Sequence, residues 1–430
     1  MAKPNLALIP ASQGSKVFSV LPSDGSGDFD FSRSGSATRI NSQGLIETVA
    51  NGQSRLNYPM IDGVVSGCPS LLLEPQRTNL LPYSEDFSNS DWTKFNSTVI
   101  ANSIISPDGT LNASKLTEDT SNSTHRIFDT IIVSASGVVC TQSIFAKSGG
   151  NGRFLRVFRG SGTYNFAVFD LDNGVVFSQG GSNIISTKIE KYPNGWYKCS
   201  STFTTQFGNI ATYYGMQNGS LDSYQGDGTS SIYIWGAQLE EGSYPTSYIP
   251  TNGSAVTRSA ETATGSGDAA TFNDSEGVLY IETNILSDDG STKTINLVNS
   301  SNPNNRLSLN YRTELGRIQM FLNYTGATAT NISIYNVDKT NYNKIVLKYK
   351  NNDMALWFNG FKLATSNTGT TSSSIGFNNI EFSRTGSDLF YGNTKQLQYY
   401  NSALTDSELE QLTSWTSFTD MAEGQLYTIE

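Results

Sequence analysis

Apolar and polar residues alternate with a period of two in many short segments of this 430-residue chain. This is the pattern of β-strands that point one face to a core and the other away from it. Arg153–Arg159 is the clearest case, with Phe154 and Phe158 on the face opposite Leu155 and Val157. Further strands in this part are predicted at Phe166–Leu171, Val175–Gln179, Trp196–Thr205 and Ile232–Leu239. Turn signals recur about every ten residues, as in jelly-roll sandwiches.

Two Asn-Gly pairs between apolar runs predict tight hairpins. A type I′ turn needs positive φ at both central residues, which Asn and Gly tolerate best. Asp172-Asn173-Gly174 separates two of the strands above. Asn359-Gly360 separates Met354–Phe358 from Phe361–Thr365. We therefore expect a type I′ hairpin at each place.

The last third of the chain predicts a second β-domain that ends in a helix. Gly277–Leu286 alternates, with Leu279, Ile281 and Ile285 on one face, and Arg317–Asn323 and Asn343–Lys350 read as further strands. The one helix is expected at Asp406–Thr413. Thr405 is its predicted N-cap, and Glu408 completes a capping box.

These patterns divide the chain into four parts. Residues 1–82 form a Gly/Ser-rich arm, too poor in apolar residues for a large core of its own, with strand-like pieces at Lys16–Leu21, Asp28–Arg33, Gly44–Val49 and Ser70–Glu74. Residues 83–250 form the first domain, 251–270 a linker or surface strap, and 271–430 the second domain. The predicted fold class is all-β: two antiparallel jelly-roll sandwiches behind an irregular β-rich arm, with one short C-terminal helix.

Composition supports this fold and narrows the function. Hydrophobic residues make up 37% and charged residues 15% of the chain, with 39 Gly, which suits turn-rich β-domains. The net charge of −10 argues against nucleic-acid binding, which needs basic surface. No segment approaches the ~20 apolar residues of a membrane span, so we expect no membrane insertion. The three cysteines, Cys68, Cys140 and Cys199, are too widely spaced for a disulfide framework or a zinc site.

Several phrases in the first 261 residues resemble tailed-phage virion proteins of the fibre or appendage type. They are Asp28–Ile40 (DFDFSRSGSATRI), Ser70–Leu81 (SLLLEPQRTNLL), Ser84–Trp92 (SEDFSNSDW) and Trp235–Glu261 (WGAQLEEGSYPTSYIPTNGSAVTRSAE), in that order. The resemblance covers residues 17–261, and the middle region looks like a carbohydrate-binding jelly roll. The C-terminal part is similar to laminin-G and concanavalin-like lectin domains, through Asn343–Tyr349 (NKIVLKY), Met354–Leu363 (MALWFNGFKL) and Leu397–Leu409 (LQYYNSALTDSEL).

This resemblance implies a virion structural protein that binds host surface glycans without cutting them. The arm would contact other virion proteins, and the protein would be a homo-oligomer, a trimer by analogy. A virion assembles in the host cytoplasm, and the apolar run at the N-terminus is too short for a signal peptide. Two other functions stay open. One is a capsid decoration protein that uses lectin-like folds for protein contacts, and the other is a polysaccharide depolymerase.

A short internal repeat connects the arm to the linker. Gly35–Arg39 (GSATR) resembles Gly253–Arg258 (GSAVTR), with one residue inserted in the second copy. The two copies flank the first domain. We expect the arm and the linker to pack near each other, as adjacent strands.

The sequence offers few candidates for catalysis. His125 is the only histidine, so any Ser-His or Cys-His site must use it, and no GxSxG elbow is present. Glycoside hydrolysis needs two carboxylates, and the clusters Asp170/Asp172 and Glu240/Glu241 are the most conspicuous. Asp172 is better explained by its turn, and Glu240/Glu241 by the end of a strand. We expect no catalytic residue.

Calcium is the metal to consider, because jelly-roll and laminin-G-like domains often hold it with loop oxygens. Asp288-Asp289-Gly290 and Asp170–Gly174 are candidates, but neither matches an EF-hand loop and both are turn sequences first. We therefore expect no metal and no cofactor.

Sugar binding would use exposed aromatic rings, because the apolar C–H faces of sugars stack on them. Trp235 and Trp357 lie among apolar neighbours and are predicted to be core residues, as is Trp196. The remaining candidates for exposed, carbohydrate-binding rings are Trp92, Tyr213 and Tyr214.

Overall fold

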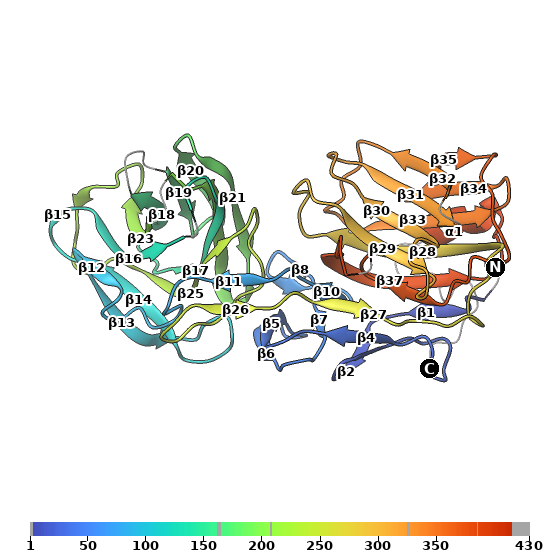
Figure 1. Ribbon diagram of the computed structural model, residues 1–430. Coiled ribbons are helices and arrows are strands. Elements are labelled where there is room, and N and C mark those ends of the chain that lie inside the picture. Colours follow the sequence, from blue (N-terminus) through green and yellow to red (C-terminus); the bar gives the residue numbers. More distant parts are fainter. Residues whose placement is uncertain are drawn as a thin grey trace.

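The protein is described by a computed structural model over residues 3–133, 135–160, 165–206, 209–324, 327–384 and 386–414. Within these residues it consists of antiparallel β-sheets and a single α-helix, α1 (Asp406–Ser414). Two lobes lie side by side, joined along one side by strands of the arm and the linker (Figure 1). The predicted class of all-β sandwiches with a short C-terminal helix is confirmed. The predicted second domain runs on to residue 430, but residues 415–430 lie outside the described part.

Two six-stranded sheets form the first sandwich. One sheet, which we call the front sheet, has the order β12 (Thr93–Phe95), β16 (His125–Ile132), β23 (Asn209–Asn218), β18 (Arg153–Gly160), β19 (Asn165–Asp170) and β20 (Val175–Gly180). The other has the order β13 (Ser97–Ile104), β14 (Ala113–Glu118), β25 (Ser231–Glu241), β17 (Val139–Ser148), β22 (Tyr197–Thr204) and β21 (Ile184–Lys191). A two-stranded ribbon, β15 (Asn122–Ser123) with β24 (Tyr224–Gln225), closes one end. Leu155 and Val157 point into the core between the sheets, as their alternation predicts.

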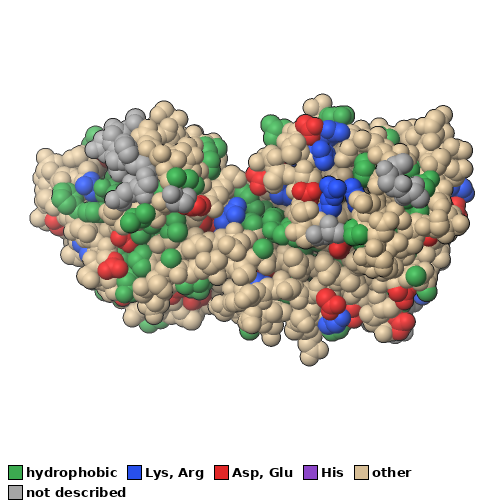
Figure 2. All heavy atoms as spheres, in the orientation of Figure 1, with side chains coloured by type: hydrophobic (Ala, Val, Ile, Leu, Met, Phe, Trp, Pro, Cys, Tyr) green, Lys and Arg blue, Asp and Glu red, His purple; other side chains and the backbone are tan. Residues whose placement is uncertain are grey.

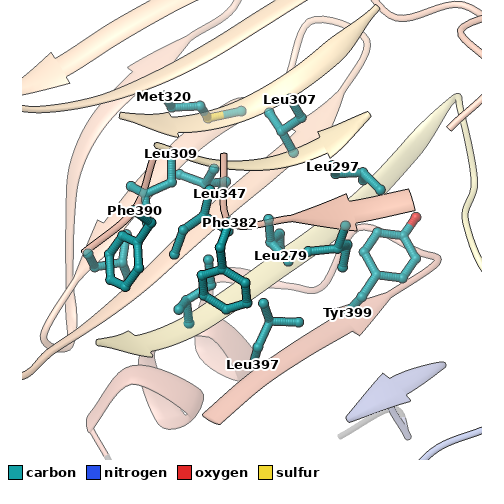
Figure 3. Close-up of a cluster of buried hydrophobic side chains, with 14 of the residues drawn as sticks. Leu279, Leu297, Leu307, Leu309, Met320, Leu347, Phe382, Phe390, Leu397 and Tyr399 are labelled. Carbon is teal, nitrogen blue, oxygen red and sulfur yellow. The ribbon is translucent and has the colours of Figure 1, made fainter. Parts of the chain in front are cut away.

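The second sandwich pairs a large sheet with a smaller one. The large sheet has the order β35 (Phe361–Ser366), β34 (Met354–Phe358), β33 (Asn343–Lys350), β28 (Glu276–Ile285), β37 (Gly392–Tyr400), β10 (Ser70–Leu73) and β7 (Arg55–Asn57), and β1 (Leu6–Leu8) also pairs with β37. The smaller has the order β32 (Ala327–Ile334), β31 (Ile318–Tyr324), β30 (Arg306–Tyr311), β29 (Lys293–Val298) and β36 (Asn379–Glu381). Leu279 of the large sheet and Leu297 and Leu307 of the smaller one meet in the core (Figure 3).

The arm is not a separate module, because its strands extend the second sandwich. β1 and β10 both pair with β37, the last strand among the described residues. Leu6, Leu8, Leu71 and Leu73 are buried in the same core as the rest of that sandwich. The remaining arm strands are β2 (Ala11–Gln13), β3 (Lys16–Phe18), β4 (Phe29–Ser32), β5 (Ala37–Ile40), β6 (Ile46–Val49), β8 (Met60–Ile61), β9 (Val64–Val65) and β11 (Arg77–Asn79).

The linker is held as two short strands against the arm. β26 (Val256–Arg258) pairs with β11, and β27 (Thr262–Thr264) pairs with β4. The expectation that arm and linker pack as adjacent strands is therefore confirmed. The two copies of the repeat are not themselves partners, because β5 pairs with β6.

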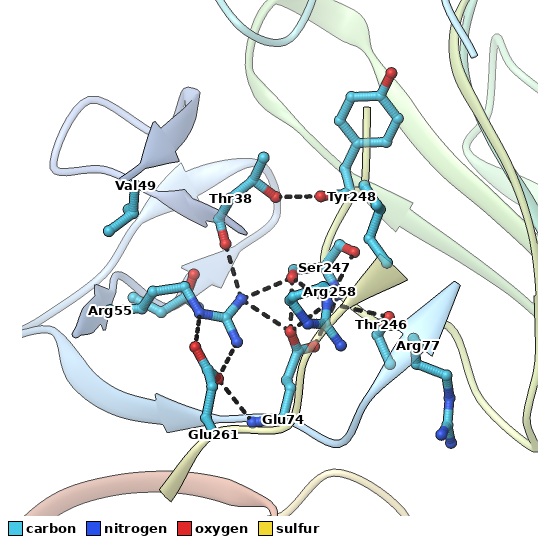
Figure 4. Close-up of polar contacts among 12 residues, drawn as sticks. Thr38, Val49, Arg55, Glu74, Arg77, Thr246, Ser247, Tyr248, Arg258 and Glu261 are labelled. Atoms are coloured by element: carbon cyan, nitrogen blue, oxygen red, sulfur yellow. Dashed lines mark hydrogen bonds and ion pairs between the residues drawn. The ribbon is translucent and has the colours of Figure 1, made fainter. Parts of the chain in front are cut away.

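A buried ion-pair cluster fastens this junction, and we call it the arginine hub (Figure 4). Glu261 of the linker accepts hydrogen bonds from Arg33 Nη1 at 2.8 Å and from Arg55 Nε at 2.8 Å. Glu74 contacts Arg55 Nη1 and Arg258 Nη1, each at 2.8 Å. All five side chains are at most 4% exposed. The hub therefore ties segments that are more than 200 residues apart in the chain.

The charges of the hub shape the ionisation of Glu74. Burial by itself would raise the pKa of Glu74. The guanidinium groups of Arg258 and Arg55, with hydrogen bonds from Ser247, outweigh burial and lower that pKa to about 2. The Glu74 carboxylate is thus a charged, paired group in the folded protein.

The two predicted hairpins both form, but only one has the predicted turn. Asn359 and Gly360 have φ of 48° and 89°, as a type I′ turn requires. The other hairpin joins β19 to β20 through residues 171–174, and among these described residues only Gly174 has positive φ. The Asp170 carboxylate accepts hydrogen bonds from the backbone N–H groups of Asp172 and Asn173, both at 3.0 Å. Type I′ was therefore wrong here, because Asp170 organises a longer loop.

Helix α1 begins as predicted. The Thr405 backbone N–H donates to Glu408 Oε2 at 2.9 Å, and Thr405 Oγ1 accepts from the Glu408 N–H at 3.4 Å. This is the reciprocal capping box, and it is confirmed. No helix in the described part of the chain is long and apolar enough to cross a membrane.

Candidate functional site

Two of the three predicted sugar-binding rings lie in the core. Trp92 is 1% exposed, packs on Phe87, and donates from Nε1 to the Tyr83 carbonyl at 2.9 Å. Tyr214 is fully buried and donates from its hydroxyl to the Ser143 carbonyl. The expectation that these two rings are exposed is wrong. Tyr213 and Tyr214 are consecutive in β23, so only one of them can point outward.

Tyr213 is the one that lies on the outer face of the front sheet. Its ring stacks on Phe158 of β18, with centroids 4.5 Å apart and planes 9° from parallel. Phe128 of β16 lies on its other flank, with a centroid distance of 4.9 Å. Register explains this row, because Tyr213 is directly opposite both residues. The row continues to Phe166, which pairs with Phe158.

The neighbouring row of the same face carries two arginines. Arg126 of β16 and Arg156 of β18 each lie opposite Gly215 of β23. The Arg126 guanidinium carbon is 4.6 Å from the centroid of Phe95, and the Arg156 carbon is 4.7 Å from that of Phe166. Guanidinium groups at these distances are attracted by the ring faces.

Together these side chains form a partly exposed patch on the front sheet, which we call the aromatic–arginine face. Its members are Phe95, Arg126, Phe128, Phe154, Arg156, Phe158, Phe166, Phe177 and Tyr213. Phe95 and Phe177 are about 40% exposed, and most of the others are half-buried. Such a surface offers flat apolar rings and several N–H donors at once. These are the elements that a cyclic polyol needs for stacking and hydrogen bonding.

Gly215 is buried and allows its neighbours to approach the strand closely. A Cβ atom at this position would lie 2.9 Å from the His125 carbonyl oxygen and 3.1 Å from Arg126 Cβ. A glycine inside a strand often marks a close approach of this kind. The Phe158 ring comes close to Gly215 and lies between the two guanidinium groups, whose carbons are 5.7 Å (Arg126) and 5.1 Å (Arg156) from its centroid.

The catalytic candidates have structural partners. His125 is buried, and its Nδ1 and Nε2 face the carbonyl oxygens of Asn96 and Tyr224 at 2.7 and 3.3 Å. Asp170 holds its own loop, and Glu240 is buried and accepts hydrogen bonds from Thr246. These contacts leave each side chain with a role in the fold.

The calcium candidates are likewise engaged by the protein. Asp288 contacts Lys339 Nζ and Asp289 contacts Lys293 Nζ, each at 2.6 Å. Among the described residues, no three His, Cys, Asp or Glu side chains gather as a metal site would require.

A cavity of about 160 Å³ lies where the arm meets the first sandwich. Lys198 lines it and donates from Nζ to the Thr246 carbonyl at 2.7 Å. Burial lowers the pKa of Lys198. The cavity is smaller than the ~300 Å³ at which ligand pockets begin, so the aromatic–arginine face is the stronger candidate site.

The sequence did contain a signal for this face. In Arg153–Arg159, both sets of alternating positions are bulky, and the outward set reads Phe154, Arg156, Phe158. An outward strand face of Phe-Arg-Phe is not an ordinary solvated face. Arg126 and Phe128 of β16 repeat the same combination. What the sequence could not supply is the register that places them beside Tyr213.

Comparisons with known proteins show modules of the kinds that the sequence resembles. The chain matches no protein-family model and no curated protein. Among solved structures, the CBM40 of Ruminococcus gnavus IT-sialidase bound to α2,3-sialyllactose is 21% identical, with a TM-score of 0.30, over 34% of this chain and 86% of that one. The CBM22 tandem domain of Paenibacillus barcinonensis Xyn10C is 12% identical, with a TM-score of 0.25, over 76% and 98%.

Domains LG4–5 of the mouse laminin α1 chain are 8% identical, with a TM-score of 0.22, over 66% of this chain and 90% of that one. Carbohydrate-binding modules and laminin G domains are thus among the structural neighbours. The function is inferred below from the aromatic–arginine face itself.

Proposed function

We propose that this protein is a non-catalytic adhesin that binds glycans on the aromatic–arginine face of its first sandwich. The observation that carries the proposal is the row Phe128, Tyr213, Phe158 and Phe166 with two arginines beside it. Phe158 is buried within this row, so the rings that can stack on a sugar are the half-buried Tyr213 and Phe166 and the exposed Phe95 and Phe177. The structural partners of His125, Asp170 and Glu240 support binding without hydrolysis over a depolymerase.

Removing the central ring tests this site. We expect Tyr213→Ala to weaken binding of the preferred glycan by at least about tenfold, because a well-packed aromatic anchor contributes more than 1 kcal/mol. A glycan array finds the ligand, and isothermal titration calorimetry measures the change. The control is Tyr335→Ala, which removes a 58%-exposed ring from the second sandwich. Equal affinity of the wild type and Tyr213→Ala would refute this location of the site.

We further propose that the protein belongs to a tailed-phage virion, as a fibre or appendage subunit. The support is the sequence resemblance over residues 17–261. In this proposal the arm contacts other virion proteins, and the subunits form a trimer. The β8–β9 hairpin is a suitable contact, because its paired residues Ile61 and Val64 are 64% and 68% exposed.

Electron microscopy of particles labelled with antibody against this protein tests the virion proposal. We expect label at the tail and host adsorption that the purified protein inhibits by competition. Label on the capsid lattice, without competition for host cells, would support the decoration protein instead. Absence from purified particles would refute both virion roles.

A further inference from the structure

Arg126 lies on β16, within the aromatic–arginine face, and no opposite charge contacts it among the described residues. Its guanidinium carbon lies 4.6 Å from the Phe95 centroid and 5.2 Å from that of Tyr213. Its one hydrogen bond between described residues runs from Nη1 to Thr124 Oγ1, at 2.7 Å. The Nε atom is buried and has no partner in the described part of the chain. Arg126 thus retains N–H donors that the fold does not use.

Nearby arginines differ from Arg126 in having a carboxylate partner, although the Nε atom of Arg156 is likewise buried without a hydrogen-bond partner among the described residues. Arg156 contacts Asp222 Oδ2 at 2.6 Å, and Arg153 contacts Glu118 Oε2 at 2.8 Å. No carboxylate of the described residues lies within ion-pair distance of Arg126. The chain carries 38 acidic and 28 basic residues, so an arginine without a carboxylate is not a consequence of composition.

A half-buried cation between apolar rings is poorly hydrated, and an anionic ligand would compensate for this. The planar fork of a guanidinium matches a carboxylate with two parallel hydrogen bonds. Arg156 lies on the far side of the Phe158 ring, with its guanidinium carbon 5.1 Å from the ring centroid. The Phe95 and Tyr213 rings lie beside Arg126. They would stack on the sugar whose carboxylate accepts hydrogen bonds from Arg126.

Building on the proposed glycan-binding function, we infer that the ligand is an acidic glycan and that Arg126 receives the carboxylate of one of its sugars. In this proposal the rings bind a sugar by stacking, and Arg126 gives the site its preference for a negatively charged sugar. Arg156 is already neutralised by Asp222 and contributes a weaker positive field. The face drawn in Figure 2 shows acidic and basic side chains interspersed, and the net charge of the chain is −10, so the proposed selection rests on the site and not on a basic net charge.

The test uses the full-length protein on an array of neutral, sulfated and carboxylated glycans. We expect binding to carboxylated glycans. The best ligand is then compared by calorimetry with the same glycan after chemical reduction of its carboxylates to alcohols. The wild type should bind the reduced glycan at least about tenfold more weakly, which is the typical effect of losing a charge-assisted hydrogen bond.

The variant Arg126→Gln should lose the same factor for the carboxylated glycan and should no longer distinguish it from the reduced one. Arg126→Lys keeps the positive charge but cannot form two parallel hydrogen bonds. Its affinity for the carboxylated glycan should lie between those of the wild type and Arg126→Gln. Arg317→Gln, which removes a guanidinium paired with Glu314 in the second sandwich, is the matched control and should bind as the wild type does. Circular dichroism and melting temperature confirm that each variant is folded.

The outcomes separate the two proposals. Binding to neutral or sulfated glycans alone, or undiminished binding by Arg126→Gln, would overturn the carboxylate inference and leave the glycan-binding function standing. Binding to no glycan on the array and to no host-cell polysaccharide would overturn the function itself, and the inference with it.

Discussion

At the scale of single residues, the arginine hub is the most consequential group of side chains. Three arginines share two buried carboxylates, so removal of one carboxylate leaves positive charges without compensation. Breaking a buried ion pair on one side costs about 3–5 kcal/mol. We therefore expect Glu74→Gln to lower the stability at pH 7 by this order, measured by chemical denaturation.

The same residue makes stability depend on pH. The pKa of Glu74 is about 2 in the folded protein and 4.5 as an ordinary carboxyl group. The unfolded chain thus binds more protons between these values, and stability falls as the pH decreases from about 4.5 towards 2. Melting temperatures across this range should fall less steeply in Glu74→Gln than in the wild type.

Glu47→Gln is the control for both measurements. Glu47 pairs with Arg39 at 3.0 Å, but its side chain is 43% exposed. Exposed pairs contribute about 0–1 kcal/mol, so this variant should keep both the stability and the acid slope of the wild type. An identical acid slope in Glu74→Gln would show that the hub does not govern acid unfolding.

At the scale of elements, the sequence correctly predicted those caps and turns whose conformation depends on interactions between residues close together in the chain. The capping box of α1 and the Asn359-Gly360 turn were predicted correctly, because their interactions lie within four residues. The loop after β19 was predicted as a hairpin with the wrong turn, because Asp170 competes for the same backbone N–H groups. The outward direction of Tyr213 depended on register with β16 and β18, which is a long-range property.

The aromatic–arginine face likewise depends partly on local sequence and partly on long-range strand order. Its Phe-Arg-Phe alternation can be read from β18 alone. Its assembly from β12, β16, β18, β19, β20 and β23 cannot, since the strand order of the sheet does not follow the order of the chain. The sequence therefore predicted the sandwich, but two of the three rings that it offered as exposed candidates, Trp92 and Tyr214, lie in the core.

At the scale of the whole molecule, the arm binds the two lobes into one structure. It adds β1, β7 and β10 to the second sandwich. It also contributes Ile46 to a buried cluster that contains Phe145 and Trp235 of the first. The arm strands have two to four residues each and no long alternation, so the sequence alone could not show that β1 and β10 pair with β37.

This architecture predicts that the first sandwich can fold without the arm and that the second cannot. The main core of the first sandwich comes almost entirely from residues 83–250. That segment should fold alone, with a lowered melting temperature because it lacks Ile46, which belongs to the same buried cluster as Trp235. The core of the second sandwich includes Leu6, Leu8, Leu71 and Leu73, so residues 271–430 alone should not unfold cooperatively.

Adding a separate polypeptide of residues 1–82 tests whether the missing arm is the reason that residues 271–430 do not unfold cooperatively. The arm should restore cooperative unfolding of residues 271–430, because it covers the bare edge of β37 and fills the core. The same arm carrying Leu71→Asp should not, since it would bury an unpaired carboxylate. Thermal unfolding followed by circular dichroism distinguishes these cases. Cooperative unfolding of residues 271–430 by themselves would mean that the arm is an attachment to a complete sandwich rather than a part of it.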